Sequence, residues 1–212
     1  MTLTWLGHSC FMLESYGFQA LIDPFRDIPG LPDICTTADA VYCSHGHSDH
    51  AYTDEVTLTT GKVNPFTVRE LDTFHDSQGG ALRGRNMVRA FTSEGLTVVH
   101  LGDLGQPLTA GQIEALGRCD VLLLPVGGTY TIDMREAKAV ADAVNPHVIV
   151  PMHFREGQAG LEILTSREEF LSQYPVDRIR RYPGNVLEIH ENMTKQVAVL
   201  ALAGYERDPH HV

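Results

Sequence analysis

The stretch Ser44-His45-Gly46-His47-Ser48-Asp49-His50 decides how the rest of this chain is interpreted. It follows an apolar run at 40–43, so it is expected to form a loop at the end of a strand. Imidazole and carboxylate groups are the preferred ligands of zinc and of the metals close to it. His45 and His47 can point to one side of an extended loop, while Asp49 and His50 turn toward a second point nearby. This spacing favours two metal ions over one, and a histidine-rich surface loop is the alternative interpretation.

The composition fits one globular domain. The chain has 212 residues, a formal net charge of −11, and no low-complexity run. This charge argues against nucleic acid or an anionic membrane as the main partner. The first residues lack the pattern of a signal peptide, no apolar run has the length of a membrane span, and the four cysteines form no CxxC pair. We therefore expect a cytoplasmic protein with free buried thiols, one domain over 1–205, and a polar tail at 206–212.

Strands are expected throughout the chain, and helices mainly in its second half. The strands are expected at 2–6, 10–14, 19–22, 40–43, 56–59, 86–92, 96–100, 121–124, 147–151, 186–190 and 196–202, with two more short ones within 63–73. Helices are expected at 109–116, 133–144 and 166–173, capped by Thr109, Asp133 and Ser166. Residues 24–39, rich in proline, form an irregular loop that is a candidate wall of a pocket. This order favours an α+β sandwich over an all-parallel sheet.

Four further polar residues each follow an apolar strand: Asp23, His75, Asp103 and His153. Polar groups at strand ends are where such scaffolds place their chemistry. Taken alone, each is a turn residue or a surface histidine. Taken with the loop at 44–50, they can complete a site for two metal ions.

The chain resembles the metallo-β-lactamase superfamily. The segments that carry this resemblance are His45-Gly-His47-Ser-Asp49-His50, His75, Gly102-Asp103 and Pro151-Met152-His153. Three others resemble its short branch of metal-dependent hydrolases, which includes ascorbate-6-phosphate lactonases: Trp5-Leu6-Gly7-His8-Ser9-Cys10-Phe11, Ile22-Asp23-Pro24 and Val126-Gly127-Gly128-Thr129-Tyr130-Thr131. The resemblance covers nearly the whole chain and implies a four-layer αββα sandwich with the metals at one edge of two packed sheets.

The resemblance also implies a role for each metal-binding candidate. The first ion would be held by His45, His47 and His75, and the second by Asp49, His50 and His153, with Asp103 bridging both. Two divalent ions are expected, zinc first, while manganese remains open because the same ligands suit both. Such a pair generates hydroxide near neutral pH and polarises the oxygen of the substrate. Asp49 would also orient the water or accept its proton.

Three residues outside the ligand set are candidates for supporting roles. Asp23 is expected to accept a hydrogen bond that fixes one ligand imidazole. His8 is a candidate substrate contact or acid, with a structural turn histidine as the equal alternative. The cluster of Arg83, Arg85 and Arg89 follows His75 and could contact a phosphate or carboxylate of the substrate, with Arg85 as the selected candidate; a solvated edge strand is the alternative.

Departures from other branches of the superfamily narrow the function. The loop has no cysteine ligand, unlike that of secreted β-lactamases, and His47 stands where iron-dependent oxygen-reducing relatives carry glutamate. No insertion is long enough for a nuclease cap domain. We therefore expect a binuclear hydrolase that uses a metal-bound hydroxide on an ester, lactone or phosphodiester of a small anionic molecule. A metal-stabilised binding or regulatory protein and a nucleic-acid phosphodiesterase are the alternatives, and a homo-oligomer remains open.

Overall fold

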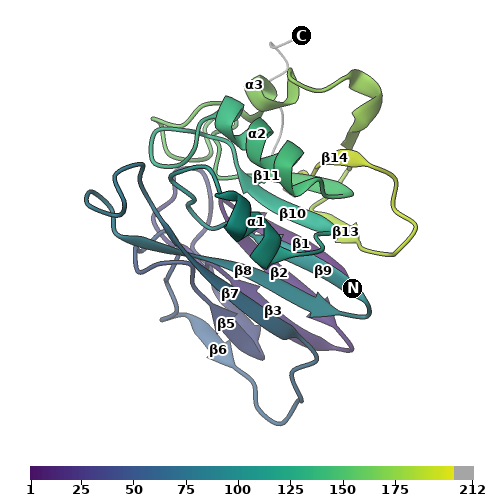
Figure 1. Ribbon diagram of the computed structural model, residues 1–212. Helices are drawn as coiled ribbons and strands as arrows, with labels where there is room; N and C mark the ends of the chain where they lie inside the picture. The colour runs from purple at the N-terminus through teal and green to yellow at the C-terminus, as the bar shows by residue number, and fades with distance from the viewer. Residues whose placement is uncertain (203–212) are drawn as a thin grey trace.

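Two β-sheets packed face to face form the centre of the protein (Figure 1). The computed structural model describes residues 1–202. The smaller sheet has five strands in the order β13-β1-β2-β3-β5, and the larger has seven in the order β12-β14-β11-β10-β9-β8-β7. A separate pair joins β4 to β6. Both large sheets mix parallel and antiparallel neighbours, as expected for an α+β protein.

The bounds of the elements follow from the backbone hydrogen bonds. The strands are β1 Thr2–Gly7, β2 Cys10–Ser15, β3 Phe18–Ile22, β4 Thr36–Ala38, β5 Ala40–Tyr42, β6 Val56–Leu58, β7 Thr67–Phe74, β8 Arg85–Ser93, β9 Leu96–His100, β10 Val121–Pro125, β11 Val148–Met152, β12 Ile179–Arg181, β13 Val186–Glu188 and β14 Gln196–Val199. The helices are α1 Ala110–Leu116, α2 Met134–Val144 and α3 Arg167–Leu171, with a 3-10 turn at Val176–Arg178.

Alternation along the strands divides the apolar side chains between two cores. On β1 and β2, Leu3, Trp5, Phe11 and Leu13 face the space between the sheets. The opposite face of the small sheet packs against a second cluster that contains Cys10, Leu21, Phe25, Ile28 and Ile34. Successive side chains of a strand point to opposite faces, so both faces of this sheet are covered. The loop at 24–35, expected to be irregular, provides much of the outer cover.

The helices lie together on the outer face of the seven-stranded sheet (Figure 1). Asp133 caps α2 as expected, and its side chain accepts hydrogen bonds from the first turn. The buried face of α2, with Ala137, Val140 and Ala141, packs toward β10. The expected α+β sandwich is thus present. The layer outside the small sheet, however, consists of the 24–35 loop and the β4–β6 pair, where the αββα expectation placed helix.

Most predicted elements are present, and the differences have local causes. The hairpin of β8 and β9 turns at Glu94-Gly95, both with positive φ. Residues 63–73 were expected to hold two short strands but contribute one, β7, an exposed edge strand whose charged residues obscure the alternation. β4 and β12, which the sequence did not indicate, have three residues each and pair with segments distant in sequence.

The expectations drawn from composition concern the cysteines, membrane spans and the end of the domain. All four cysteines are free, with Cys10 and Cys119 buried as expected but Cys35 exposed. Within residues 1–202, no helix is long and apolar enough to cross a membrane. The end of the predicted domain at 205 and the predicted tail at 206–212 lie outside the described residues.

Candidate metal centre

The predicted ligands lie where several strands of the two sheets end. Each follows the carboxyl end of a strand: the 44–50 loop after β5, His75 after β7, Asp103 after β9 and His153 after β11. His8 and Asp23 follow β1 and β3 in the same way. The packed sheets therefore bring together residues separated by more than a hundred positions in the chain.

One group of side chains contains the three residues predicted for the first ion. One ring nitrogen from each of His45, His47 and His75 lies within 4.8 Å of the others. The ring centroid of His45 is 4.7 Å from that of His47 and 4.6 Å from that of His75. His75 is buried and His47 is exposed, so this group opens to solvent on one side.

A second group contains the residues predicted for the other ion and one more. Ligand atoms of Asp49, His50, His153 and His8 all lie within 4.8 Å of one another. His8, His50 and His153 are buried, and Asp49 is partly exposed. The sequence predicted three of these four residues as ligands, and the structure adds His8 to their neighbourhood.

Asp103 lies between the two groups. Its Oδ1 is 3.2 Å from His50 Nε2, and its Oδ2 is 3.4 Å from His75 Nε2 and 3.2 Å from His153 Nε2. Burial raises the pKa of this carboxyl, but His153 and His50 outweigh burial and hold the pKa well below its usual range. The carboxylate is therefore ionised in the position that a ligand shared by two ions would occupy.

Many polar atoms of the two groups lack hydrogen-bond partners in the protein and are suitable as metal ligands. Buried nitrogens of His8, His45, His50, His75 and His153 have no hydrogen-bond partner among the described residues. A buried polar atom without a partner costs about 1–3 kcal/mol, so several in one place indicate a missing ligand. Imidazole nitrogens with carboxylates are the donors expected for zinc or manganese. The residues present therefore fit divalent cations.

Electrostatics supports the same conclusion. Burial, reinforced by His50, lowers the pKa of His45 to about 3. A neutral imidazole is the form that binds metal. Burial also lowers the pKa of His50, but Asp103 and Asp23 outweigh it and raise the pKa well above its usual value. These buried carboxylates create a negative field that favours cations.

Asp23 has the geometry expected of a residue that orients a ligand. His50 Nδ1 donates a hydrogen bond to its Oδ2 at 2.8 Å, and this bond leaves His50 Nε2 directed at Asp103. Ser44 donates to both carboxylate oxygens of Asp23, from its backbone nitrogen and from Oγ, each at 2.6 Å. Burial raises the pKa of Asp23, but His100, His50 and Ser44 together lower it. Asp23 is thus an ionised acceptor that fixes the tautomer of His50.

Asn86 positions Asp103, a role that the sequence did not indicate. Its Oδ1 accepts a hydrogen bond from the backbone nitrogen of Asp103 at 2.9 Å, while its Nδ2 donates to Thr73 and to the Leu101 carbonyl. Gly102 has a φ of +55°, and a Cβ there would lie 2.3 Å from Asn86 Oδ1. An asparagine within a strand gives no signal in a single sequence, so this role became visible only in the structure.

Three site residues adopt a backbone conformation that is unfavourable for side chains with a Cβ. The φ angles of His8, Asp23 and His153 are +48°, +49° and +52°. Such left-handed residues cost of order 1–3 kcal/mol each, and they gather at functional sites when the surrounding fold enforces them. The strained turns therefore coincide with the strand ends that carry the site.

A cavity of about 240 Å³ opens directly over both groups. It is lined by His47, Asp49, His75, Arg83, Asp103 and Tyr130. The guanidinium of Arg83 lies 5.1 Å from the centre of the Tyr130 ring, an arrangement in which the two side chains support each other. This cavity gives a small molecule access to the candidate metal centre.

The prediction for Arg85 differs from what the structure shows. The Arg85 side chain is exposed, lies 3.4 Å from Asp72 at the edge of the sheet, and is not among the residues that line the cavity. Arg83, two residues earlier, is the arginine of that cluster which reaches the cavity. The side chains of Arg83 and Arg85 differ in direction because Arg83 lies in a turn and Arg85 begins β8.

Known proteins show which family has this fold and this site. A family model described as the beta-lactamase superfamily domain matches residues 2–153. A relative from Caldivirga maquilingensis, named a metal-dependent hydrolase, is 28% identical over 226 residues that cover 88% of this chain and 97% of the relative. One of the same description from Archaeoglobus fulgidus is 31% identical and covers 73% of this chain and 83% of the relative. The chain belongs to the β-lactamase superfamily.

Solved structures agree with this assignment. A protein of Thermotoga maritima, described as a Zn-dependent hydrolase of the metallo-β-lactamase superfamily, is 36% identical, with a TM-score of 0.74 over 95% of this chain and 99% of that one. A metallo hydrolase from Ignicoccus hospitalis shares the fold at 22% identity and a TM-score of 0.61, over 81% of this chain and 89% of that one. The chain is thus a metal-dependent hydrolase of the metallo-β-lactamase superfamily.

Proposed function

We propose that this hydrolase has a binuclear centre and cleaves an ester, lactone or phosphodiester of a small anionic molecule. The observation that carries the proposal is the position of Asp103, whose two carboxylate oxygens face histidines of both groups at 3.2–3.4 Å. A carboxylate surrounded in this way suits a ligand shared between two cations. His45, His47 and His75 would hold one ion, and Asp49, His50 and His153 the other.

The chemistry needs a nucleophile and an acceptor for its proton. Two divalent ions held by these residues, zinc or manganese, would supply the first, because bound cations lower the pKa of water and polarise the oxygen of the substrate. Asp49 supplies the second. Burial raises the pKa of Asp49, but His8 and His50 outweigh burial and lower it, so the carboxylate is ionised at neutral pH. Asp49 also lines the cavity, where its oxygens can orient a water or accept its proton.

Arg83 and Tyr130 give the cavity its preference among substrates. Both line the cavity together with His47 and His75, and the Arg83 guanidinium has no carboxylate within ion-pair distance among the described residues. A guanidinium in this position can bind a phosphate or carboxylate through two hydrogen bonds. The tyrosine ring holds its plane. We therefore assign recognition of the anionic group of the substrate to Arg83.

A substrate screen with paired variants tests this proposal. Zinc- or manganese-loaded protein is assayed on anionic and neutral esters, lactones and phosphodiesters. His45→Ala should abolish turnover while the protein remains folded. Arg83→Gln should raise KM for the anionic substrate by about 10–100-fold, the value of a charge-assisted hydrogen bond, and leave neutral analogues unaffected. Arg85→Gln is the matched control and should change KM less than about twofold, because an exposed ion pair contributes little.

Two outcomes would contradict the proposal. Activity of folded His45→Ala on every substrate would show that the metal centre does not perform the reaction. A fully loaded protein that turns over nothing on the panel would favour a metal-stabilised binding or regulatory protein. Strong salt-dependent affinity for RNA or DNA would instead support a nucleic-acid phosphodiesterase, against the net charge of −11.

A further inference from the structure

We propose that His8 is a further protein ligand of the ion held by Asp49, His50 and His153, in addition to the shared Asp103. This inference rests on the proposed binuclear centre and changes the character of one of its two sites. It goes beyond the ligand set that the motifs imply, because in that set the turn after β1 contributes no ligand.

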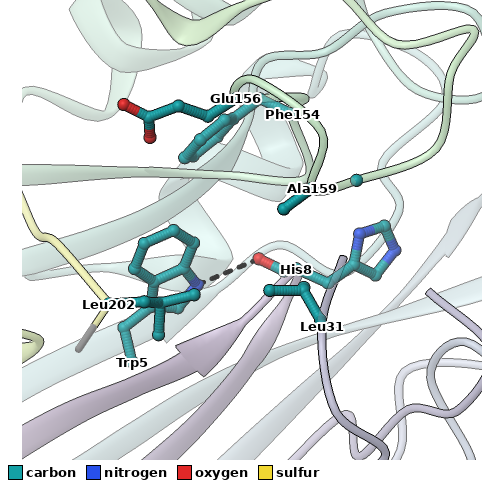
Figure 2. A pocket seen from close by; sticks show the side chains of 8 residues that line it. Trp5, His8, Leu31, Phe154, Glu156, Ala159 and Leu202 are labelled. Carbon is teal, nitrogen blue, oxygen red and sulfur yellow. Dashed lines mark hydrogen bonds between the residues drawn. The ribbon is translucent and has the colours of Figure 1, made fainter. Parts of the chain in front are cut away.

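The backbone of His8 is held from two directions. Its carbonyl accepts a hydrogen bond from Trp5 Nε1 at 3.1 Å and another from the backbone nitrogen of His153 at 3.3 Å. Figure 2 shows the Trp5 bond, with the His8 imidazole directed to the opposite side of its own backbone. The φ of +48° makes this arrangement unfavourable unless something enforces it. The turn therefore presents the imidazole in one fixed direction, toward His153.

The imidazole is buried without any hydrogen bond. The side chain of His8 has no exposed surface, and neither ring nitrogen has a hydrogen-bond partner among residues 1–202. Its ring centroid is 4.3 Å from that of His153 and 5.2 Å from that of His50. Its Nε2 is 3.6 Å from Asp49 Oδ2, which is too long for a hydrogen bond. A buried imidazole with two unsatisfied nitrogens is costly, so the site needs another partner.

The separations match those between ligands of a common ion. Zinc binds histidine nitrogen and carboxylate oxygen at roughly 2.0–2.2 Å, so two ligands of a tetrahedral site are about 3.4 Å apart. His8 Nε2 lies 3.6 Å from Asp49 Oδ2, and His50 Nε2 lies 3.7 Å from the same atom. His8 and His50 therefore stand in the same relation to Asp49. If His50 binds this ion, the distance from His8 to Asp49 is equally suitable for His8 to bind it.

His100 shows what a structural histidine looks like in this fold. It is also buried, but its Nε2 donates to the Ser9 carbonyl at 2.9 Å and its Nδ1 accepts from the Gly102 nitrogen at 3.0 Å. Both of its nitrogens are satisfied by protein. The protein thus satisfies a buried histidine that packs in the core and leaves the nitrogens of His8 free.

The ligand His8 would make the two ions unequal. With the shared Asp103 counted, the second ion would have five protein ligands, three of them buried histidines, whereas the first would have four and lie beside the cavity. A zinc site becomes closed as protein ligands fill its coordination positions, whereas a catalytic site keeps one position open. The second ion should therefore bind more tightly and resist chelators for longer, while the first offers the open position to substrate.

Metal titration of three variants tests the role of His8. Metal-free protein is titrated with Zn²⁺ against a chromophoric chelator, and the sites are followed by the ligand-field absorption of Co²⁺. His8→Ala and His8→Gln should keep one site at wild-type affinity and weaken the other by more than the 10–100-fold that follows loss of an outer hydrogen-bond partner. His147→Ala, a half-exposed histidine before β11, is the control and should bind both ions normally.

The two substitutions separate a ligand from a hydrogen-bond donor. Glutamine places an amide near the position of Nε2 that can donate a hydrogen bond toward Asp49, but it is a poor zinc ligand. Wild-type affinity at both sites in His8→Gln would overturn the proposal, as would unchanged affinity in His8→Ala. If wild-type protein itself binds fewer than two ions, the binuclear function fails first and this inference fails with it.

A measurement on wild-type protein tests the role of His8 even if the variants do not fold. Crystals of the zinc-loaded protein, with the ions located by anomalous scattering, should show His8 Nε2 within about 2.2 Å of the second ion. A distance beyond about 3 Å, with two ions present, would overturn the assignment of His8 while leaving the binuclear centre intact.

Discussion

Asp23→Asn is the substitution that most sharply separates orientation of a ligand from direct binding. Asp23 accepts three hydrogen bonds, two from Ser44 and one from His50 Nδ1. An asparagine can keep the bond from the Ser44 nitrogen through its amide oxygen. Its NH₂ group, however, would replace the oxygen that now accepts from His50. His50 must then lose this partner or move its proton to Nε2, the atom needed to bind metal.

The expected loss follows from this change of tautomer. Removing an outer partner of a metal-binding histidine typically weakens metal binding 10–100-fold, or about 1.4–2.8 kcal/mol. The larger loss should fall on the ion held by His50; a smaller loss is expected at the ion held by His45, because Ser44 Oγ donates to Asp23 Oδ2 and lies 2.9 Å from His45 Nδ1. Competition between protein and chelator for Zn²⁺, with the two steps fitted separately, measures both affinities.

Asp39→Asn is the matched control. Its carboxyl is also shielded, accepts bonds from Lys62, Thr59 and the Gln19 nitrogen, and lies outside the groups that could hold a metal. Both variants remove one negative charge, but only Asp23→Asn should lower the affinity of the protein for a metal ion. Equal affinities in Asp23→Asn and wild type would refute the claim that Asp23 sets the tautomer of His50.

Three further predictions concern stability. Hydrogen bonds from Lys62 and then Thr59 lower the pKa of Asp39 to about 2, below its value in the unfolded chain, so the stability that Asp39 contributes is present above pH 4 and is lost as pH falls toward 2. The free energy of unfolding of Asp39→Asn should therefore fall less steeply than that of wild type between pH 4 and 2, and an identical slope would contradict this. Gly105→Ala should lower the free energy of unfolding in urea by at least about 2 kcal/mol, because the added Cβ would lie 2.2 Å from the backbone nitrogen of Asp76. Gly111→Ala in α1, where the Cβ meets open space, should leave this free energy unchanged or raise it by up to about 1 kcal/mol. Equal stabilities of the two variants would contradict the close packing around Gly105. Removal of metal by a chelator should lower Tm, with recovery on adding zinc, since an ion that binds only the folded state stabilises by mass action; an unchanged Tm would contradict tight binding.

The candidate ligands could be grouped from the sequence because of where they lie. The ligand types in the 44–50 loop are adjacent in sequence, and His75, Asp103 and His153 each follow a recognisable apolar run. Strand ends converge at one edge of a sandwich, so local pattern and the three-dimensional neighbourhood coincide. The structure places all of these side chains together.

The sequence could not select among residues whose positions depend on turns. Arg83 and Arg85 have the same chemistry, but only Arg83 lines the cavity. Its turn is shaped by Asp76, whose carboxylate accepts hydrogen bonds from four backbone nitrogens, including that of Arg83. The alternation of a strand cannot report such a turn. The same holds for His8, whose direction depends on a left-handed backbone and on bonds from Trp5 and His153.

Short and exposed strands were the other source of error. β7 lies at an edge of the large sheet, where solvent removes the need for alternating apolar residues. β4 and β12 are defined by pairing with β6 and β14, partners about twenty residues away. Because these strands depend on tertiary contacts, sequence periodicity carries little information about them.

The metal content of gently purified protein, measured by elemental mass spectrometry, tests the central claim most directly. The binuclear account predicts about two divalent ions per chain after reconstitution with zinc or manganese, and about one or fewer in folded Asp103→Ala, which lacks the shared carboxylate. A wild-type protein that holds no ion after reconstitution, or an Asp103→Ala protein that holds two as tightly as wild type, would contradict it.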